Sequence, residues 1–351
     1  MISGFKICIT GGSGFIGSTL VEALIENNTI TVLDNFGRNR LQNLPCSQHP
    51  NLTLLKGDVL NYVDVSRAVT GADYIIHCAG IAGIDTVVKK PVETMRVNMV
   101  GSYNVLEAGA SQTQCRRVIC FSTSEVFGSQ AFSAKETDRT IVGAAGQARW
   151  TYAVSKLAEE HLALAYFQEF NLPITVVRPF NVYGPGQIGE GALKIFIQRA
   201  LNDEPLYIYG DGTQIRAWCY VDDMVKAVLK VMEEPKSLGE TFNIGNPRSV
   251  ETIWGLANTV IRILGSKSKI EFKPALSADI ELRLPCVQKA TDLLNFTAKV
   301  DLEEGILRTA AYYKEMHDIF SQTGYHDFGS HKHWGSPVGG LFDPGPEGSN
   351  F

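Results

Sequence analysis

A tyrosine and a lysine four positions apart are the residues of this sequence best placed to do acid–base chemistry together. They are Tyr152 and Lys156 in the stretch WTYAVSK, which begins a segment with helical periodicity. Residues four apart share one face of a helix, so the phenol and the ammonium would be neighbours. A lysine ammonium favours phenolate and lowers the pKa of a tyrosine from its usual value of about 10. We therefore expect Tyr152 to act as a base that Lys156 assists.

Four glycines within eight residues indicate the kind of ligand that would lie near this base. The stretch TGGSGFIG covers residues 10–17, follows the apolar run FKICI, and spaces Gly11, Gly14 and Gly17 as GxxGxxG. A turn without side chains lets the backbone approach a pyrophosphate, whose charge the N–H groups at the start of the next helix can bind. The pattern predicts a dinucleotide site.

The next apolar run ends in Asp34, 17 residues after Gly17. A carboxylate at this position can accept hydrogen bonds from both ribose hydroxyls of an adenosine, and it repels a 2′-phosphate. It therefore predicts NAD rather than NADP as the cofactor. Arg38 and Arg40, in the following loop, would favour a 2′-phosphate if they faced it; otherwise they are expected to lie in solvent.

The elements that must hold these residues can be read from six short apolar runs separated mostly by helical segments. The runs are FKICIT, TITVLD, NLTLLKGD, ADYIIHCA, RRVICFST and PITVVRPF. Strands that are apolar on both faces and alternate with helices indicate a parallel sheet covered on each side. We expect an α/β fold with a doubly wound parallel sheet of the Rossmann type. Its ligands bind at the carboxyl ends of the strands, where the fifth run ends in the hydroxyl-rich stretch FSTSE.

Composition narrows the class of protein. With 44% apolar residues, 20% charged residues and a net charge of -5, the chain is typical of a folded globular protein without a basic field for nucleic acid. Its seven cysteines are scattered and predict reduced thiols. No apolar stretch reaches the about 18 residues of a membrane span, and the first strand begins too early for a signal peptide. We expect a cytoplasmic protein with no nucleic-acid, membrane or metal partner.

The order of the motifs resembles the extended short-chain dehydrogenase/reductase family, whose members modify nucleotide sugars. The resemblance covers roughly residues 5–315 and rests on TGGSGFIG, VLDNF, GDV, HCAG, VNMVGSYNV, STSEVFG, YAVSK, RPFNVYGPG and GDGTQIRAWCYVDD. It implies a catalytic group of Thr123, Tyr152 and Lys156. The cofactor contacts that it implies are Gly11, Gly14, Phe15, Ile16, Gly17, Asp34, Asn35, Asp58, Val59, Asn98, Tyr152 and Lys156. The implied substrate contacts are Ser124, Arg149, Asn181 and Arg216.

The resemblance also implies a reaction that starts with oxidation of the sugar at C4. Tyr152 would take the hydroxyl proton while NAD takes the hydride, with Lys156 on the nicotinamide ribose and Thr123 on the sugar oxygen. The resulting ketone acidifies the C5 proton, and a carboxylate on C5 turns the sugar into a β-keto acid that loses carbon dioxide. The substituents of the sugar therefore decide between epimerisation, dehydration and decarboxylation.

Glu125 in STSEVFG bears on that decision because it places a carboxylate beside the reacting centre. The 4-epimerases that resemble this chain more often carry a small residue there, whereas Arg149 and Trp150 are similar to the RWxY stretch of UDP-glucuronate decarboxylases. The loop GPGQIGEGA, however, lacks an arginine that many decarboxylases carry and is closer to epimerases. We expect a UDP-glucuronate decarboxylase, a lyase that forms UDP-xylose or a 4-keto pentose. The alternatives are a 4-epimerase, an isomerase acting on UDP-glucose or UDP-glucuronate, and a 4,6-dehydratase.

The expected organisation has two domains and a tail. Residues 1–180 would form the NAD-binding domain, to which the chain returns at about 217–240; residues 181–216 and 241–320 would form a smaller α/β substrate domain; and 321–351 would be a C-terminal extension. The resemblance implies a homodimer through the helices at 91–111 and 151–170. His77 is expected to be structural, and the tail residues His326, His331 and His333 are not expected to bind a metal.

Overall fold

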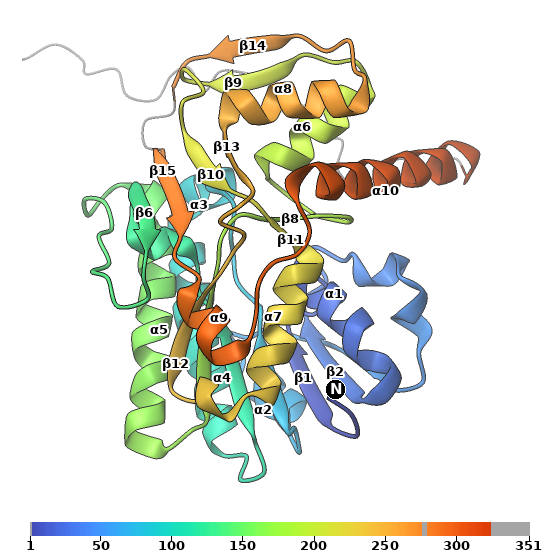
Figure 1. The fold of residues 1–351 in the computed structure, drawn as a ribbon. Helices are drawn as coiled ribbons and strands as arrows, with labels where there is room; N and C mark the ends of the chain where they lie inside the picture. The colour runs from blue at the N-terminus through green and yellow to red at the C-terminus, as the bar shows by residue number, and fades with distance from the viewer. Residues whose placement is uncertain (1, 276–278, 324–351) are drawn as a thin grey trace, which may run out of the picture.

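The computed structural model describes residues 2–275 and 279–323 and contains a seven-stranded, fully parallel sheet with the strand order β12-β7-β5-β4-β1-β2-β3 (Figure 1). Its strands are β1 (Lys6–Thr10), β2 (Thr29–Asp34), β3 (Leu52–Lys56), β4 (Tyr74–His77), β5 (Arg117–Phe121), β7 (Ile174–Pro179) and β12 (Glu240–Ile244). Each of the six apolar runs supplies one strand. The strand order reverses between β1 and β4, which marks the point where such sheets bind ligands. The predicted doubly wound fold is confirmed.

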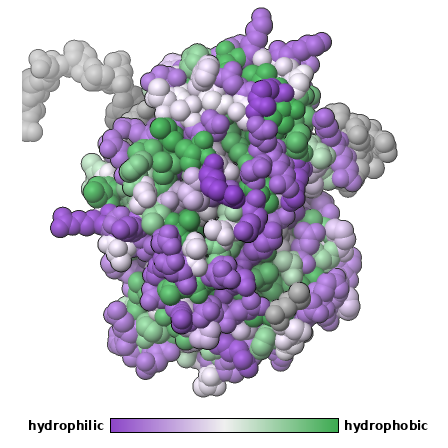
Figure 2. Space-filling view, in the orientation of Figure 1, coloured by the Kyte–Doolittle hydropathy of each residue, from purple (hydrophilic) through white to green (hydrophobic). Residues whose placement is uncertain are grey.

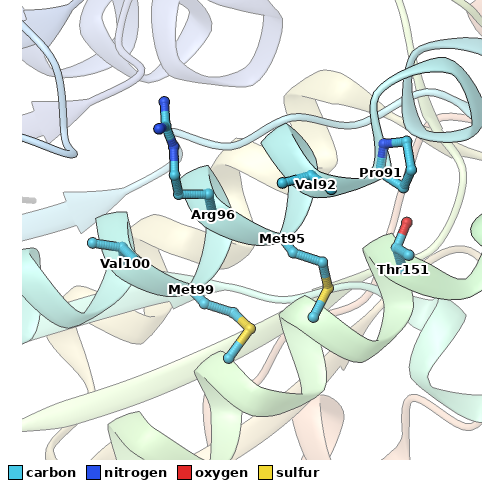
Figure 3. A pocket seen from close by; sticks show the side chains of 7 residues that line it. All are labelled: Pro91, Val92, Met95, Arg96, Met99, Val100 and Thr151. Atoms are coloured by element: carbon cyan, nitrogen blue, oxygen red, sulfur yellow. The ribbon is translucent and has the colours of Figure 1, made fainter.

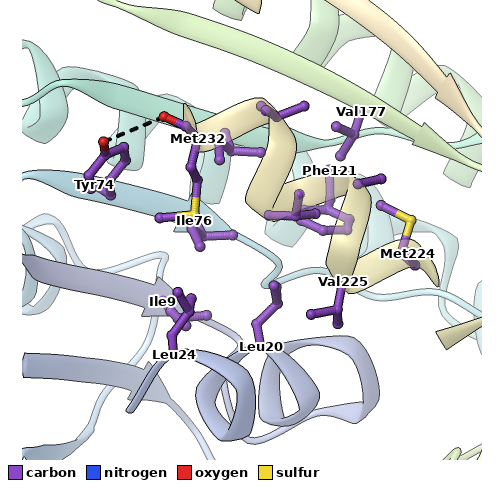
Figure 4. Close-up of a cluster of buried hydrophobic side chains, with 14 of the residues drawn as sticks. Ile9, Leu20, Leu24, Tyr74, Ile76, Phe121, Val177, Met224, Val225 and Met232 are labelled. Carbon is purple, nitrogen blue, oxygen red and sulfur yellow. Dashed lines mark hydrogen bonds between the residues drawn. The ribbon is translucent and has the colours of Figure 1, made fainter. Parts of the chain in front are cut away.

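The sheet is buried on both faces because its strands carry apolar residues at successive positions. On β1, Ile7 and Ile9 point to one face and Cys8 to the other. The first face packs against α1 (Phe15–Leu24), α7 (Val221–Glu233) and α9 (Gln288–Leu294), and Figure 4 shows Leu20 of α1 and Met224 of α7 in this layer. The second face packs against α2 (Tyr62–Val69), α4 (Pro91–Ala110) and α5 (Thr151–Phe170).

A smaller part of the chain lies beyond the carboxyl ends of these strands (Figure 1). It contains a four-stranded sheet in the order β13-β10-β15-β6 and two strand pairs, β8 with β11 and β9 with β14. The strands are β6 (Gln130–Ala134), β8 (Val182–Tyr183), β9 (Leu206–Tyr209), β10 (Ile215–Ala217), β11 (Cys219–Tyr220), β13 (Val250–Thr252), β14 (Ile270–Lys273) and β15 (Leu282–Pro285). The helices are α6 (Ala192–Leu201), α8 (Ile253–Leu264) and α10 (Leu302–Thr323).

The chain passes between the two parts more than once. The chain leaves the large sheet after β7 and comes back with α7 and β12, while β6 is donated to the smaller sheet by a segment that lies between β5 and α5. The two parts therefore share chain segments rather than a single linker.

The surface in the view of Figure 2 is hydrophilic over much of its area, and hydrophobic residues gather mainly in its upper half, over the smaller part.

The glycine-rich turn between β1 and α1 is fixed by backbone contacts. Gly11 has a φ of +70°, and a Cβ there would lie 2.6 Å from the backbone nitrogen of Ala79. A Cβ on Gly17 would lie 2.7 Å from the Cα of Gly12. At Gly14 the nearest atom would be 3.4 Å away, an ordinary contact. Gly11 and Gly17 thus serve the packing of the turn, whereas Gly14 leaves its outer side open.

This difference predicts that Gly17→Ala and Gly14→Ala have unequal effects on stability. Gly17→Ala forces the methyl group against backbone that cannot move away, so the free energy of unfolding should fall by about 2 kcal/mol. Gly14→Ala should leave it nearly unchanged because the backbone there has an ordinary φ of -72°. Urea unfolding of both variants measures the difference, and an equal loss in the two would contradict this account of the turn.

Candidate active site

The N-terminus of α1 has the features of a pyrophosphate site. The helix begins at Phe15 after Gly14, and no side chain caps its first N–H groups. Its first turn, with Phe15, Ile16 and Gly17, contains no acidic residue that would repel an anion. Uncapped N–H groups and the positive end of the helix dipole favour a bound phosphate. The residues present therefore fit the dinucleotide predicted from the glycine spacing.

Asp34 lies at the end of β2 beside this turn. Its carboxylate accepts hydrogen bonds from the backbone N–H groups of Ser13, at 3.0 Å, and Phe36, at 2.8 Å. These bonds orient the carboxylate and leave further lone pairs for ribose hydroxyls. Asn35 is exposed next to it, and its side chain accepts a hydrogen bond from the Gly37 N–H at 2.8 Å.

Arg40 is expected from the sequence either to face a 2′-phosphate or to lie in solvent, and the second of these expectations is wrong. It is 7% exposed, and its guanidinium donates to the hydroxyls of Ser18 and Thr19 on α1 at 2.9 and 3.0 Å. The α1 hydroxyls and the close approach of Gly186 hold it against the helix. Arg38 is exposed. Because the Arg40 guanidinium already donates hydrogen bonds to α1, it is less available to bind the 2′-phosphate of NADP than the sequence suggested.

Three further residues predicted to contact the cofactor lie along the carboxyl edge of the sheet. Asp58 is exposed after β3 and accepts a hydrogen bond from the Leu60 N–H. The carbonyl of Val59 accepts one from the Asn104 side chain of α4 at 2.8 Å. Asn98 is buried on α4, and its amide exchanges hydrogen bonds with the backbone of Ile81 at 2.8 and 3.1 Å. Asn98 thereby fixes the segment that follows β4.

The structure brings Thr123, Tyr152 and Lys156 together at the ends of β5 and the start of α5. Burial raises the pKa of Tyr152, while the Lys156 ammonium and a hydrogen bond with Thr123 oppose the rise. The pKa therefore lies above its ordinary value, although the Tyr–Lys pair alone predicts a lower one, because burial disfavours phenolate more than Lys156 favours it. The Lys156 ammonium donates to Glu159 at 2.7 Å.

Glu125 is held beside this group by arginines. Arg149 donates to both of its carboxylate oxygens, at 2.6 and 3.2 Å, and Arg283 approaches it to 3.8 Å. Glu125 is close enough to Tyr152 to raise the pKa of the phenol. The side chain of Glu125 is 17% exposed, so it is not a solvated loop carboxylate. A bidentate ion pair fixes the direction of this carboxylate.

Arg283 is the residue of this group that the sequence did not reveal. It lies on β15 and is fully buried, and the register of the small sheet pairs it with Arg216 on β10. Burial lowers the pKa of Arg283 to about 9 and that of Arg216 to about 10. No motif surrounds Arg283 in the sequence, and the pairing of β15 with β10 and β6 brings it to Glu125. Arg216 also donates to the carbonyl of Ile280 and to Asp279.

The other predicted substrate residues lie at the same end of the sheet. Ser124 is buried at the start of the short helix Ser124–Phe127. Asn181 follows β7 with a φ of +39°, and its side chain donates to the Ala217 carbonyl of β10 at 2.8 Å. From the loop before α6, Glu190 accepts hydrogen bonds from the backbone N–H groups of Asp85 and Thr86 at 2.9 and 3.2 Å, so it joins this loop to α3 (Ile84–Lys89).

His77 is structural, as expected. Its Nδ1 atom lies 2.7 Å from the Thr10 hydroxyl and its Nε2 atom 3.0 Å from the Ser102 hydroxyl. Burial, and then the nearby Lys156 ammonium, lower its pKa to about 3. A neutral imidazole therefore joins β1, β4 and α4 close to Lys156.

Two other features were sought in the part of the chain that the structure describes. No cluster of three metal-ligating side chains occurs within residues 2–275 and 279–323; His326, His331 and His333 lie outside them. None of the helices described has the length and apolar character of a membrane span.

The fold and the site together define a class of protein: a doubly wound dinucleotide-binding fold with a Tyr–Lys pair at the switch point of its sheet. The chain belongs to the NAD dependent epimerase/dehydratase family, whose model matches residues 7–245. The resemblance drawn from the motifs is thus confirmed.

Individual relatives cover nearly the whole chain. The UDP-N-acetyl-alpha-D-glucosaminuronate decarboxylase of Bacillus cytotoxicus is 34% identical over 89% of this chain and 98% of that protein. UDP-glucuronic acid decarboxylase 2 of Arabidopsis thaliana is 34% identical over 86% of this chain and 67% of that protein. Among solved structures, the UDP-glucuronic acid 4-epimerase of Bacillus cereus, in complex with UDP-glucuronic acid and NAD, superposes with a TM-score of 0.81 at 29% identity over 89% of this chain and 99% of that one.

The neutral state of His77 predicts a loss of stability in mild acid. Below pH 6.5 the unfolded chain binds a proton on this histidine that the folded protein does not bind, so stability falls as the pH falls toward 3. Between pH 6.5 and 5 the loss should be about 2 kcal/mol. Unfolding free energies at both pH values should show a smaller loss for His77→Asn than for the wild type. His161→Gln, an exposed change on α5, should behave like the wild type; equal slopes in wild type and His77→Asn would refute the prediction.

Proposed function

We propose that this protein is an NAD-dependent decarboxylase of UDP-hexuronates, with UDP-glucuronate as the expected substrate. The relatives with the matching activity support the proposal, and so does the group of arginines around Glu125. A decarboxylase must bind a sugar that carries an extra negative charge at C5. The site of a simple 4-epimerase acting on a neutral sugar has no such requirement.

The observation that carries the proposal is the charge balance beside Tyr152. Among the described residues, Arg149, Arg216 and Arg283 pair with the carboxylates of Glu125 and Asp279, so one positive charge is in excess there. The Nε atoms of Arg149 and Arg283 are also buried without a hydrogen-bond partner among the described residues. Buried donors without partners are costly, and a bound carboxylate would satisfy them. A uronate is the sugar that brings such a carboxylate.

The first step needs a base, a positioned sugar and the cofactor. NAD would be held by the turn at Gly14, the N-terminus of α1 and Asp34, and when bound it supplies the hydride acceptor for C4. Tyr152 takes the proton of the 4-hydroxyl as phenolate, and Thr123 hydrogen-bonds the same oxygen. The Lys156 ammonium favours the phenolate against the effect of burial. These residues produce a ketone at C4.

The second step follows from the chemistry of that ketone. A carboxylate on C5 is β to the C4 carbonyl, so the C5–C6 bond breaks and its electrons pass into an enolate as carbon dioxide leaves. C5 then takes up a proton. We assign the relay of this proton from solvent water to C5 to Glu125, the carboxylate that Arg149 and Arg283 hold beside Tyr152. The arginines hold the substrate carboxylate until its bond breaks.

Epimerisation at C4 of UDP-glucuronate is the second candidate, because one observation favours it. The loop before α6 carries Glu190 rather than a cation, and this carboxylate is bound to the backbone of α3. The Bacillus cereus structure is a 4-epimerase acting on a UDP-uronate. The same arginine group would serve such an enzyme, which differs in leaving the carboxylate in place.

The activity can be tested with the purified full chain and a set of nucleotide sugars. Incubation with UDP-glucuronate, and separately with UDP-N-acetylglucosaminuronate, should release carbon dioxide and give a UDP-pentose or 4-keto pentose by NMR. Tyr152→Phe should reduce the rate by about 10²-fold or more. Tyr166→Phe, which alters a tyrosine of the same helix that donates to Glu107 instead, should retain activity.

Conversion of UDP-glucuronate to its C4 epimer without carbon dioxide would replace the proposal by the second candidate. UDP-glucose, dTDP-glucose and GDP-mannose serve as comparison substrates. A 4-keto-6-deoxy product from any of them, with none from the uronates, would identify a 4,6-dehydratase.

We further propose that two copies of the chain pair through α4 and α5. An apolar hollow of about 500 Å³ lies on this face, lined by Pro91, Val92, Met95, Arg96, Met99, Val100 and Thr151. Figure 3 shows Met95 and Met99 side by side over α5. Val92 is 79% exposed and Met99 39%, and a soluble surface gains nothing from such residues unless another molecule covers them.

The pairing predicts a monomer for Val92→Lys. A buried ammonium on this face would have no partner, so the variant should elute as a monomer when its molar mass is measured by light scattering, while the wild type elutes as a dimer. Val63→Lys, on α2, is a matched control because Val63 is similarly exposed at 71% but lies away from the hollow. A wild-type monomer, or a Val92→Lys dimer, would rule out this interface.

A further inference from the structure

Lys156 has a buried carboxylate as its partner, and no role in the proposed reaction accounts for it. Glu159 lies one helical turn further along α5 and accepts a hydrogen bond from the Lys156 ammonium at 2.7 Å. Both side chains are nearly inaccessible, Lys156 at 4% and Glu159 at 0% exposure. An exposed pair with this spacing would be weak, but a buried one has strong interactions with few competing waters. The pair therefore bears directly on the state of the catalytic lysine.

The titratable groups that face the pair from the sheet are neutral, and Glu160, which is the next residue of α5, pairs with Arg178. The titratable groups that face Lys156 from the sheet are His77, Cys78 and Cys120, and Tyr152 faces it from its own helix. Burial lowers the pKa of His77 to about 3 and raises the pKa of both thiols, so these three carry no charge at neutral pH. Glu159 is thus the anion that contacts the Lys156 ammonium.

Polar, uncharged groups lie on the other side of Glu159. Burial raises the pKa of Glu159, whereas the Lys156 ammonium and the Ser102 hydroxyl on α4 oppose this rise. The imidazole of His77 lies 3.0 Å from the Ser102 hydroxyl. Thr10 on β1 completes the series with its contact to His77 at 2.7 Å. Within the described residues, the hydrogen bond to the Glu159 carboxylate comes from the Lys156 ammonium, and the Oε1 atom of Glu159 is buried without a partner.

We propose that Glu159 is a positioning residue that keeps Lys156 a charged ammonium in a pocket that would otherwise discharge it. Burial alone disfavours a lysine cation by lowering its pKa, and the contact with Glu159 reverses this effect. Lys156 can assist the Tyr152 phenolate only while it is charged. This inference rests on the proposed C4 oxidation by Tyr152 and Lys156, and it assigns the support of that step to Glu159.

Two measurements on Glu159→Gln test the proposal. The first is the pH profile of kcat/KM with the substrate that is turned over. Without its counter-ion, Lys156 should lose its proton at lower pH, so the alkaline limb should move down by about 1 pH unit or more. Glu159→Asp should restore part of the shift. An alkaline limb that stays in place would overturn the proposal.

The second measurement does not depend on activity. In Glu159→Gln the folded protein should release the Lys156 proton below the pH at which the unfolded chain does, so its stability should rise with pH in that window. The unfolding equilibrium constants of wild type and variant should accordingly approach each other by about tenfold between pH 7 and 10. A gap that is constant with pH would mean a packing role and would sink the inference.

A neighbouring carboxylate provides the matched control. Glu160 is buried on the same helix and pairs with Arg178 at 2.6 Å. A guanidinium keeps its proton throughout this range, so the stability gap of Glu160→Gln should not narrow between pH 7 and 10. If no nucleotide sugar is turned over, the proposed function fails while this second measurement still decides the role of Glu159.

Discussion

The burial of one ammonium group at the carboxyl ends of β4 and β5 is the constraint around which this site is organised. Lys156 must be shielded from water to influence Tyr152, yet shielding disfavours its charge. The protein meets this conflict with Glu159 below the lysine and with uncharged groups, His77 and two thiols, on the strands behind it. The neutral polar layer between β1, β4 and α4 therefore forms part of the surroundings of Lys156.

A second group of charges, around Glu125 near Tyr152, is not balanced within the protein. There the cations outnumber the anions, and two buried arginine nitrogens lack partners within the described residues. Arg216 and Arg283 are neighbours across a parallel strand pair, where like charges repel unless anions separate them. Glu125 and Asp279 offset part of this repulsion. The positive charge that remains in excess is compatible with the proposed anionic substrate. The charges on one side of Tyr152 are thus balanced within the protein, whereas the other side has an excess of positive charge that the proposed substrate would balance.

The sequence alone predicts the large sheet and the cofactor side of the site well, because both depend on local patterns. Strands buried on two faces leave continuous apolar runs, and the turn at Gly11, Gly14 and Gly17 leaves a fixed spacing. The remaining features depend on contacts between distant segments. Arg283 reaches Glu125 through the pairing of β15 with β10 and β6, Arg40 is withdrawn from solvent by α1, and the pKa of Tyr152 reflects burial that no spacing reveals.

The donation of β6 to the smaller sheet limits how this molecule can change over evolution. Ala131 of β6 stands in register with Arg283, and β6 begins three residues after the helix that carries Glu125. A short tether and a ladder of backbone hydrogen bonds thus tie Arg283 to a carboxylate that belongs to the other half of the chain. Recombination could not exchange the part with the smaller sheet as a separate cassette, so changes in this group of charges would have to arise by substitutions in both parts together.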